Sequence, residues 1–296
     1  SLRAKTTTRR AIKSRFGEDA PVGATFRPRR FGTERTRDSA VRVAAVQHDI
    51  FWEDPTANIH RLEGLVGGAA RAGARLAVLP EFFSTGSSWD PAMAEPLDGP
   101  SMSFLRSVSA SAKIWVCGTV AIRHDNGSVT NTVAIAGPEG TLHLSEKHHL
   151  SSGREAEVFR SSQRLDTFTI EDLRVTPFVG HDIRFPRDFW DAAPDTDVFL
   201  VPGAEPESRR RQWRVLLGAR AIENQCYVIG VNRVGSGAGV SYAGDSAIID
   251  PQGEVLASGA GTEALLMAEV ESALERFTRD RSPLLAERTP DLITLD

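Results

Sequence analysis

From residue 41 the sequence alternates between strand-like and helix-like segments, and this alternation limits the folds that the chain can adopt. VRVAAVQHDI has the alternating pattern of a strand, NIHRLEGLVGGAARAG has apolar residues at helical spacing, and RLAVLPEFF is typical of a buried strand. The second half repeats the alternation with DVFLVPG, a long helix over PESRRRQWRVLLGARAIENQ, and CYVIGVNRVG. This alternation predicts an α/β fold.

Hairpins interrupt the alternation. KIWVCGTVAIR, VTNTVAIAGP and TLHLSEK are predicted strands, and the turn sequences HDNG and GPEG join them. Further strands are predicted at LDTFTI, LRVTPFV, GDSAIID, EVLASG and LLMAEV. Because hairpins lie among the strand–helix units, we predict one domain with two sheets and helices outside them.

Composition excludes several classes of protein. The chain has 296 residues, of which 41% are hydrophobic and 25% charged, and its net charge of −4 does not suggest binding to nucleic acid or an anionic membrane. No apolar run approaches the roughly 18 residues of a membrane span, and no signal-peptide core is evident. Cys117 and Cys226 lie in apolar runs. We therefore expect reduced core cysteines in a cytoplasmic protein.

The two ends of the chain differ from the middle. Residues 1–40 hold 11 Lys and Arg against 4 Asp and Glu, with little apolar periodicity, which predicts a disordered basic extension. A targeting peptide, a partner-binding arm or a start site placed too early are the alternatives. Residues 276–296 are expected to form an arm that packs on another surface, such as a second subunit. The domain itself is predicted to span 41–275.

Two charged residues at predicted strand ends are candidates for chemistry. Glu81 in PEFF follows an apolar strand, and a carboxylate at the edge of an α/β sheet can act as a general base. Lys147 in SEKHHL ends a hairpin strand, and its ammonium can stabilise an oxyanion. Taken singly, such residues are most often solvated surface groups.

Other polar clusters do not predict a ligand. His143, His148 and His149 do not have the spacing of a zinc site, and no cysteine accompanies them, so we predict neither a metal nor a cofactor. The run Arg209–Arg211 is typical of a solvated helix start, and GSGAG of a flexible loop. Neither has the spacing of a phosphate-binding loop.

The stretch FVGHDIRFPRDFW, residues 178–190, has the pattern of a nucleophile turn. An apolar strand ending is followed by a small residue, a polar pair and the start of a helix. Gly180 stands at the apex, where a nucleophile is expected. The turn therefore lacks the side chain that would attack a substrate.

The order PEFF…EKHHL…VGHDIRFP resembles the nitrilase superfamily, the carbon-nitrogen hydrolases that use Glu, Lys and Cys. PEFFSTGSS, TNTVAIAGPEG, RQWRVLLGARAIENQCYVIGVNRVG and YAGDSAIIDPQGEVL are most similar to its omega-amidase-like branch, and the resemblance covers about residues 41–275. It implies a single-domain, four-layer α-β-β-α sandwich and a homo-oligomer. The subunits would associate through the face that carries the C-terminal arm and the helix predicted to begin after the Gly180 turn, which we call the elbow helix.

The resemblance also implies a thiol acyl-transfer mechanism. Glu81 would take the thiol proton, the cysteine would attack the amide carbonyl, and Lys147 would stabilise the oxyanion. Glu155 is the best match for a second glutamate, with Glu157 as the alternative. The substrate-binding positions implied in this way are Phe83, His181 and Glu205.

The chain departs from the family pattern at two places. Where the family has Cys-Tyr-Asp-x-Arg-Phe-Pro, residues 180–186 read Gly-His-Asp-Ile-Arg-Phe-Pro. Glycine can keep a strained turn although the nucleophile is lost, and neither Cys117 nor Cys226 is placed to replace it. The family's Asn-Trp-Pro is replaced by Ala-Glu-Pro at residues 204–206, which exchanges an aromatic wall for a carboxylate. These changes together favour divergence over a single laboratory substitution.

Three functional hypotheses follow. The first is an amidase-like protein, by ancestry a hydrolase of non-peptide C–N bonds in small carboxamides, which is catalytically impaired or altered because Gly180 replaces the cysteine. The second is an active hydrolase in which Glu81 activates a water in the vacated space. The third is a non-catalytic ligand-binding or regulatory subunit. In each, the expected ligand is a small carboxamide or carboxylate.

Overall fold

The computed structural model describes residues 40–288. Its first sheet has six strands in the order β13-β1-β2-β3-β4-β5. The strands are β1 (Ala40–Gln47), β2 (Leu76–Val78), β3 (Trp115–Arg123), β4 (Val129–Ala136), β5 (Leu142–Glu146) and β13 (Ala264–Glu271). The pairs β1–β2 and β2–β3 are parallel, whereas the remaining pairs are antiparallel.

The second sheet has seven strands in the order β10-β11-β9-β8-β7-β6, with β12 paired to β11. They are β6 (Phe168–Ile170), β7 (Leu173–Pro177), β8 (Val198–Gly203), β9 (Tyr227–Asn232), β10 (Val234–Gly237), β11 (Val240–Ile249) and β12 (Val255–Ala260). Strands β7, β8 and β9 are parallel to one another. Each sheet therefore combines a parallel centre with antiparallel hairpins.

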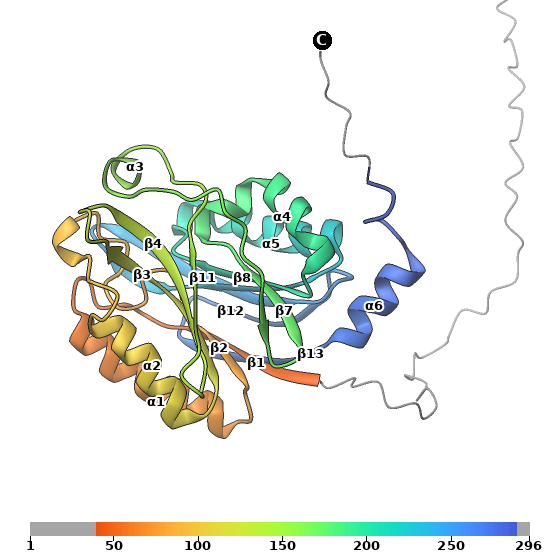
Figure 1. Cartoon of the computed structure of the whole chain (residues 1–296), viewed down its shortest axis with the longest axis horizontal. Coiled ribbons are helices and arrows are strands. Elements are labelled where there is room, and N and C mark those ends of the chain that lie inside the picture. The colour runs from red at the N-terminus through yellow and green to blue at the C-terminus, as the bar shows by residue number, and fades with distance from the viewer. Residues whose placement is uncertain (1–39, 289–296) are drawn as a thin grey trace, which may run out of the picture. The chain divides into compact units, whose positions relative to one another are not determined.

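Helices cover the outer faces of both sheets (Figure 1). The α-helices are α1 (Pro55–Arg71), α2 (Pro100–Ala112), α3 (Arg154–Val158), α4 (Pro186–Ala192), α5 (Arg210–Asn224) and α6 (Ser272–Arg281). Short 3₁₀ helices are η1 (Pro91–Met93), η2 (Gly180–Arg184), η3 (Ala193–Asp195) and η4 (Glu207–Arg209). Helix α1 begins where the Asp54 carboxylate accepts a hydrogen bond from the Ala57 N–H, with Pro55 at the first helical position.

Three hydrophobic clusters separate four layers. One lies between the sheets and joins residues such as Val43 and Val133 to Leu200 and Ile229. The second packs α1 and α2 on the first sheet, and the third packs α4 and α5 on the second. The predicted four-layer α-β-β-α sandwich is thus confirmed, and Figure 1 shows the two helical layers on opposite sides of the strands.

Some local predictions were wrong. No helix was predicted at residues 151–159, but they contain the short helix α3. The GSGAG segment forms the hairpin between β10 and β11, and Cys226 directly precedes β9 instead of lying within a strand. Strand β2 ends at Val78, so PEFF lies in the following turn.

One of the predicted domain boundaries, the one after residue 275, falls inside a helix of the structure. Helix α6 runs across the boundary placed after residue 275 and follows β13 without a break. The basic extension of residues 1–40 lies outside the described residues, except for Ala40, which begins β1. Residues 289–296 of the predicted arm also lie outside them. Between residues 40 and 288, no helix is both long and apolar enough to cross a bilayer.

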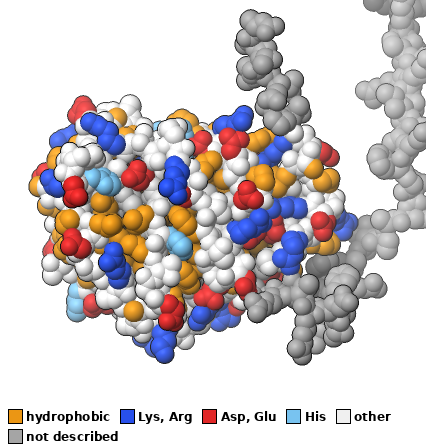
Figure 2. All heavy atoms as spheres, viewed as in Figure 1, with side chains coloured by type: hydrophobic (Ala, Val, Ile, Leu, Met, Phe, Trp, Pro, Cys, Tyr) orange, Lys and Arg blue, Asp and Glu red, His pale blue; other side chains and the backbone are white. Residues whose placement is uncertain are grey.

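Charged and apolar side chains are mixed on one face of the protein. On the face in Figure 2, acidic and basic side chains are interspersed among hydrophobic ones.

Strand ends from both sheets meet at one edge. Glu81 follows β2 of the first sheet, while Gly180 follows β7 and Ala204 follows β8 of the second. The Glu81 N–H donates to the Gly203 carbonyl at 3.2 Å and so links the two edges. Since the crevice outside the carboxyl ends of parallel strands is the usual ligand site of open α/β sheets, this edge is where a site is expected.

Candidate functional site

A cavity of about 530 Å³ opens at this edge. Its walls include five of the sequence-predicted site residues, Glu81, Lys147, Glu155, His181 and Glu205. They come from loops after β2, β5, β7 and β8 and from α3. The tertiary structure thus gathers residues that are up to 124 positions apart in the sequence, between Glu81 and Glu205.

Glu81 is 5% exposed and is held by three neighbours. Its Oε1 accepts hydrogen bonds from Asn131 Nδ2 at 2.7 Å and from Lys147 Nζ at 2.9 Å. Its Oε2 accepts from the Ala204 N–H at 3.1 Å. The carboxylate is therefore held by groups from both sheets.

Lys147 bridges two carboxylates. Its N–H donates to the Asn131 carbonyl at 2.9 Å, which fixes the residue directly after β5. Its Nζ donates to Glu81 Oε1 at 2.9 Å and to Glu155 Oε1 at 2.6 Å. An ammonium held between two carboxylates in the wall of a cavity is placed to stabilise negative charge on a bound molecule.

The structure distinguishes the two candidates for the second glutamate. Glu155 is 3% exposed, and its Oε2 accepts hydrogen bonds from both the N–H and the hydroxyl of Ser151 at 2.7 Å. Glu157 lies on the exposed side of α3. The helix that sequence analysis missed is thus what directs Glu155 inward to Lys147 and Glu157 outward to solvent.

The three charges shift one another's pKa. Burial raises the pKa of Glu81 above its ordinary value, because desolvation outweighs the attraction of Lys147. Burial acts in the same direction on Glu155, but Lys147 and the Ser151 hydrogen bonds outweigh it and lower its pKa. Burial lowers the pKa of Lys147, yet Glu81 and Glu155 together raise it above its ordinary value. Glu81 is thus the member best suited to exchange a proton.

Gly180 begins η2 at the predicted turn and has φ of +42°. This left-handed conformation is one that glycine adopts without the steric cost of a Cβ. A Cβ built there would lie 2.5 Å from Glu81 Oε2. The space beside the Gly180 Cα is therefore taken by the Glu81 carboxylate.

Asp182 ties this turn to the segment that carries Lys147, although sequence analysis gave it no role. Its carboxylate accepts hydrogen bonds from the Val179 N–H at 2.8 Å and from the His149 N–H at 2.7 Å. It is 1% exposed. The Asp in the family-like turn motif was visible in the sequence, but its partners come from a segment about 30 residues away.

His181 lies beside Gly180 on the cavity wall. Its ring packs edge-on against Phe185, with 5.5 Å between centroids, and its Nδ1 is buried without a hydrogen-bond partner among residues 40–288. Burial lowers the pKa of His181, and the positive charges of Lys147 and Arg184 lower it further. The ring is therefore neutral near pH 7.

Glu205 lines the cavity at the position where an aromatic residue was expected from the family pattern. Its Oε2 accepts a hydrogen bond from Arg184 Nη2 at 2.9 Å, and its backbone N–H donates to Asn232 Oδ1 at 2.9 Å. The carboxylate is 5% exposed. Its charge is thus balanced within the wall by Arg184, which sequence analysis did not single out.

Phe83 does not belong to this group. It is fully buried in the cluster between the first sheet and its helices, and its ring fills the space above Gly118. It does not line the cavity. The expectation that it contacts substrate is therefore not supported by its position, because β2 ends early and the turn directs this side chain into the core.

Asn131 and Tyr242 were also missed. Asn131 is a buried amide in the middle of β4, and its Nδ2 donates to Glu81. Tyr242, from β11, forms part of the cavity wall. The signal for Asn131 was an amide side chain in the strand VTNTVAIA, whose other residues are apolar or threonine, since a buried polar group needs a partner.

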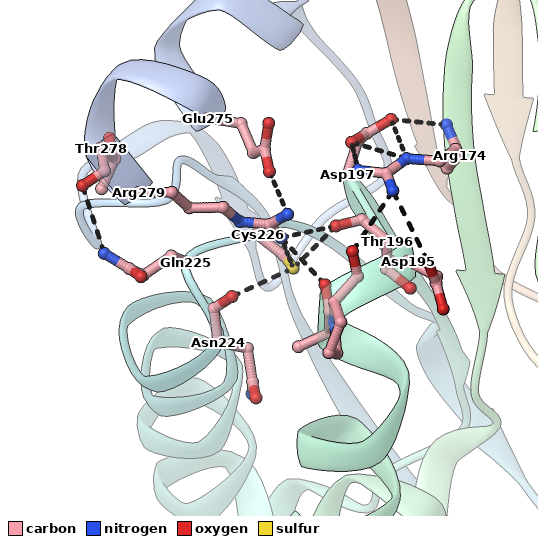
Figure 3. A network of polar contacts seen from close by, with 12 residues as sticks. Arg174, Asp195, Thr196, Asp197, Asn224, Gln225, Cys226, Glu275, Thr278 and Arg279 are labelled. Carbon is pink, nitrogen blue, oxygen red and sulfur yellow. Dashed lines mark hydrogen bonds and ion pairs between the residues drawn. The ribbon is translucent and has the colours of Figure 1, made fainter. Parts of the chain in front are cut away.

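Neither cysteine lies in the cavity. Cys117 is buried in β3, and burial raises its pKa. Burial raises the pKa of Cys226 to about 12, and its thiol donates to the Thr196 and Asn224 carbonyls under α6 (Figure 3). Both thiols are therefore poor nucleophiles.

The remaining histidines have structural contacts. The rings of His148 and His149 share the Asp188 carboxylate, at 3.3 Å and 2.7 Å, and His143 stacks on Trp115 and Phe168. Across residues 40–288 no group of three or more His, Cys, Asp and Glu side chains is arranged to hold a metal ion.

Comparison with known proteins agrees with this geometry. The carbon-nitrogen hydrolase family profile matches residues 42–280. The chain is 32% identical over 247 residues to omega-amidase YafV of Escherichia coli K12, covering 82% of this chain and 94% of that protein. It is 33% identical over 261 residues to 2-oxoglutaramate amidase of Bacillus subtilis 168, covering 84% and 98%.

A solved structure shows the same fold. XC1258 of Xanthomonas campestris, described as a CN-hydrolase superfamily protein, superposes with a TM-score of 0.81 at 31% identity, covering 86% of this chain and 99% of that one. The family profile spans most of the chain, and two relatives exceed 30% identity over more than two thirds of it. The chain belongs to the carbon-nitrogen hydrolase family, in its omega-amidase-like branch.

Proposed function

We propose that this protein binds small carboxamides and is an altered amidase in which hydrolysis does not pass through a cysteine acyl-enzyme. The observation that carries the proposal is the chain of contacts Glu81–Lys147–Glu155 on the cavity wall, with Gly180 against Glu81. These contacts support an amidase-like arrangement of charged groups, and Gly180 has no side chain that could form a covalent bond.

The ligand class follows from the wall. A carboxamide oxygen is an acceptor that the Lys147 ammonium can approach, and the neutral ring of His181 leaves room for an uncharged amide beside it. Relatives are named as an omega-amidase and a 2-oxoglutaramate amidase. Because Arg184 forms an ion pair with Glu205, the Glu205 carboxylate repels an anionic ω-amide less than the protein sequence alone suggested. Exposed Arg154 and Arg209, also on the wall, favour such a ligand.

The hypothesis that Glu81 activates a water in the space of the lost cysteine has less support. Glu81 Oε2 lies 2.5 Å from the position of a Cβ on Gly180, so the carboxylate itself takes this space. Three of its lone-pair positions are used by Asn131, Lys147 and Ala204. A water molecule beside the Gly180 Cα would have to displace the Glu81 carboxylate.

Two measurements test the proposal. Isothermal titration with 2-oxoglutaramate and with butyramide is expected to show binding that weakens at least 10-fold in Lys147→Met, since the charged donor is lost. His60→Ala, at a side chain that is 89% exposed, is the matched control and should bind as the wild type does. Intact-mass analysis after incubation with these amides should show no acyl adduct. Absence of binding, or an adduct on Cys117 or Cys226, would contradict the proposal.

We also propose a homo-oligomer. Large apolar side chains are exposed on α4, α5 and α6, where Trp190, Val215, Ile222 and Phe277 are between 38% and 62% exposed. This is the face that carries the elbow helix and the start of the predicted arm. Light scattering after size-exclusion chromatography is expected to give at least twice the 32.2 kDa mass of the chain. Val215→Asp together with Ile222→Asp should lower that mass. A monomer in the wild type would contradict the proposal.

A further inference from the structure

We infer that His181 is the general base of this site and activates a water molecule for direct attack on a bound carboxamide. The inference rests on the proposed amide-binding function and adds the residue that replaces the thiol step. His181 directly follows Gly180, lines the same cavity as Glu81 and Lys147, and is the histidine of that wall.

The ring of His181 is held by packing instead of by polar partners. It contacts Phe185 edge-on, and His149 stacks on the same Phe185 at 3.7 Å between centroids. Its Nδ1 is buried without a hydrogen-bond partner among residues 40–288, and the residue lines the cavity. No hydrogen bond from residues 40–288 to this ring is found, which leaves Nε2 available to a water or a ligand.

The other histidines near the site are already engaged. His149 Nε2 contacts the Asp188 carboxylate at 2.7 Å, and both ring nitrogens of His148 have partners, Asp188 and the Arg164 carbonyl. His181 is therefore the imidazole near the cavity that can accept a proton without breaking an existing contact.

The surrounding charges support a proton acceptor. Lys147 and Arg184 face His181 as cations, and Glu155 and Glu205 as anions. Burial and the two cations lower its pKa, and the two anions oppose them only in part. At pH 7 the imidazole is neutral, which is the form that can take a proton from water.

Glu81 is less suited to this role in the present geometry. Both of its oxygens accept hydrogen bonds, one from Asn131 and Lys147 and the other from Ala204. It holds the Lys147 ammonium in the wall, and Lys147 in turn faces the oxygen on which negative charge develops. His181 therefore acts as the base, and Lys147 acts as the hydrogen-bond donor to the oxyanion.

The step balances without a cofactor. Water attacks the carbonyl carbon, its proton passes to His181 Nε2, and the carbonyl oxygen takes the electron pair of the C=O π bond as an oxyanion beside Lys147. The imidazolium then donates its proton to the amide nitrogen, the C–N bond breaks, and ammonia and a carboxylic acid form. The imidazole returns to its neutral form.

The test measures hydrolysis of 2-oxoglutaramate and butyramide by ammonia release in full-length wild type, His181→Ala, His181→Gln and His60→Ala. Loss of a general base is expected to lower kcat/KM by about 10²–10⁴-fold in both His181 variants. His60→Ala should match the wild type. His181→Gln retains a polar side chain of similar length, and thermal unfolding of each variant separates loss of the base from loss of the fold.

Two further readouts separate a base from a packing residue. The wild-type kcat/KM should fall as the pH drops below the lowered pKa of His181, and this acid limb should be absent from the residual activity of His181→Gln. Free imidazole should restore part of the activity of His181→Ala and none of that of Lys147→Met.

Each contrary result has a distinct meaning. If both folded His181 variants retain kcat/KM within threefold of the wild type, His181 is not the base. If amides bind by titration but the wild type releases no ammonia, the inference about His181 and the hydrolysis part of the proposed function both fail, whereas amide binding stands. If no amide binds, the proposed function fails as well.

Discussion

Two buried charged networks in this protein resemble each other in chemistry but differ in access. The site network joins Glu81, Lys147 and Glu155 on the cavity wall. The other, which we call the α6 network, joins Arg279 and Glu275 of α6 to Cys226 (Figure 3). Arg279 Nη2 also donates to the Ala193 and Thr196 carbonyls at 3.0 Å and 2.7 Å.

The comparison shows which observation identifies a site. Burial raises the pKa of Glu275 as it raises that of Glu81, so a shifted pKa does not distinguish them. The α6 network pairs one arginine with one carboxylate, and Nη2 of that arginine also donates to two carbonyls. The site network instead places one ammonium between two carboxylates. The site network also borders a cavity. An excess of carboxylate beside a cavity, and not burial alone, is what marks chemistry here.

Removing the cation should give the largest effects in both networks. Lys147→Met leaves Glu81 and Glu155 buried without their partner, and Arg279→Met does the same to Glu275. Each variant is expected to lose about 3–5 kcal/mol of unfolding free energy in urea titrations. Only Lys147→Met should weaken amide binding. Equal binding loss in Arg279→Met would show that the two networks are not functionally distinct.

Thiol chemistry should separate the two regions next. The Cys226 thiol, with a pKa of about 12, is expected to react with a thiol reagent at pH 8 about 10³-fold more slowly than a free cysteine. A thiol introduced by Gly180→Cys would border the cavity near Lys147 and should label first, as followed by intact mass. Fast labelling of Cys226 in the folded wild type would contradict the burial of the α6 network.

The contact between Gly180 and Glu81 should have a smaller, measurable cost. Gly180→Ala introduces a Cβ at a left-handed φ, which costs about 1–2 kcal/mol, and the Cβ must also displace Glu81 Oε2. Gly127→Ala is the matched control, since φ there is +81° and a Cβ would meet nothing within 4 Å. Chemical denaturation should show the larger loss for Gly180→Ala. Equal losses would mean that Glu81 moves aside freely.

The smallest expected effect is on the pH dependence of stability. Because burial raises the folded-state pKa of both Glu81 and Glu275, the folded state holds each proton more tightly than the unfolded state. Each therefore makes the protein less stable as the pH rises from the unfolded pKa, about 4.5, through the higher folded pKa. Glu81→Gln and Glu275→Gln should both flatten this decline in thermal melts from pH 4 to pH 7. A steeper decline in either variant would reverse the sign assigned to that carboxyl.

Much of the fold could be predicted from local patterns. The strands were predicted from apolar residues at a period of 2, and the helices from apolar residues at a period of 3.6. The hairpins predicted at the HDNG and GPEG turns are confirmed, since both turns join antiparallel strands. The helix α3 was missed because its five residues are too few for a helical period to be visible. The early end of β2 was missed because an apolar run does not show where pairing stops, and this sent Phe83 to the core.

Only the site residues that lie in recognisable sequence motifs could be predicted. Glu81, Lys147 and Glu155 were identified from their order along the chain, and their distances agree with that reading. Asn131, Asp182 and Arg184 were visible as polar residues of a strand and of the turn motif, but their roles could not be predicted, since these depend on partners in distant segments.

The sequence by itself determined the α/β class, the family and the absence of a side chain at residue 180, because each of these is a property of residue identity and local order. Only the tertiary structure decided that Glu81 takes the space beside Gly180, that Arg184 balances Glu205, and that Nδ1 of His181 has no hydrogen-bond partner within residues 40–288. The physical reason is that burial and charge depend on which side chains meet. In this protein the side chains of the site come into contact at the ends of strands from two different sheets.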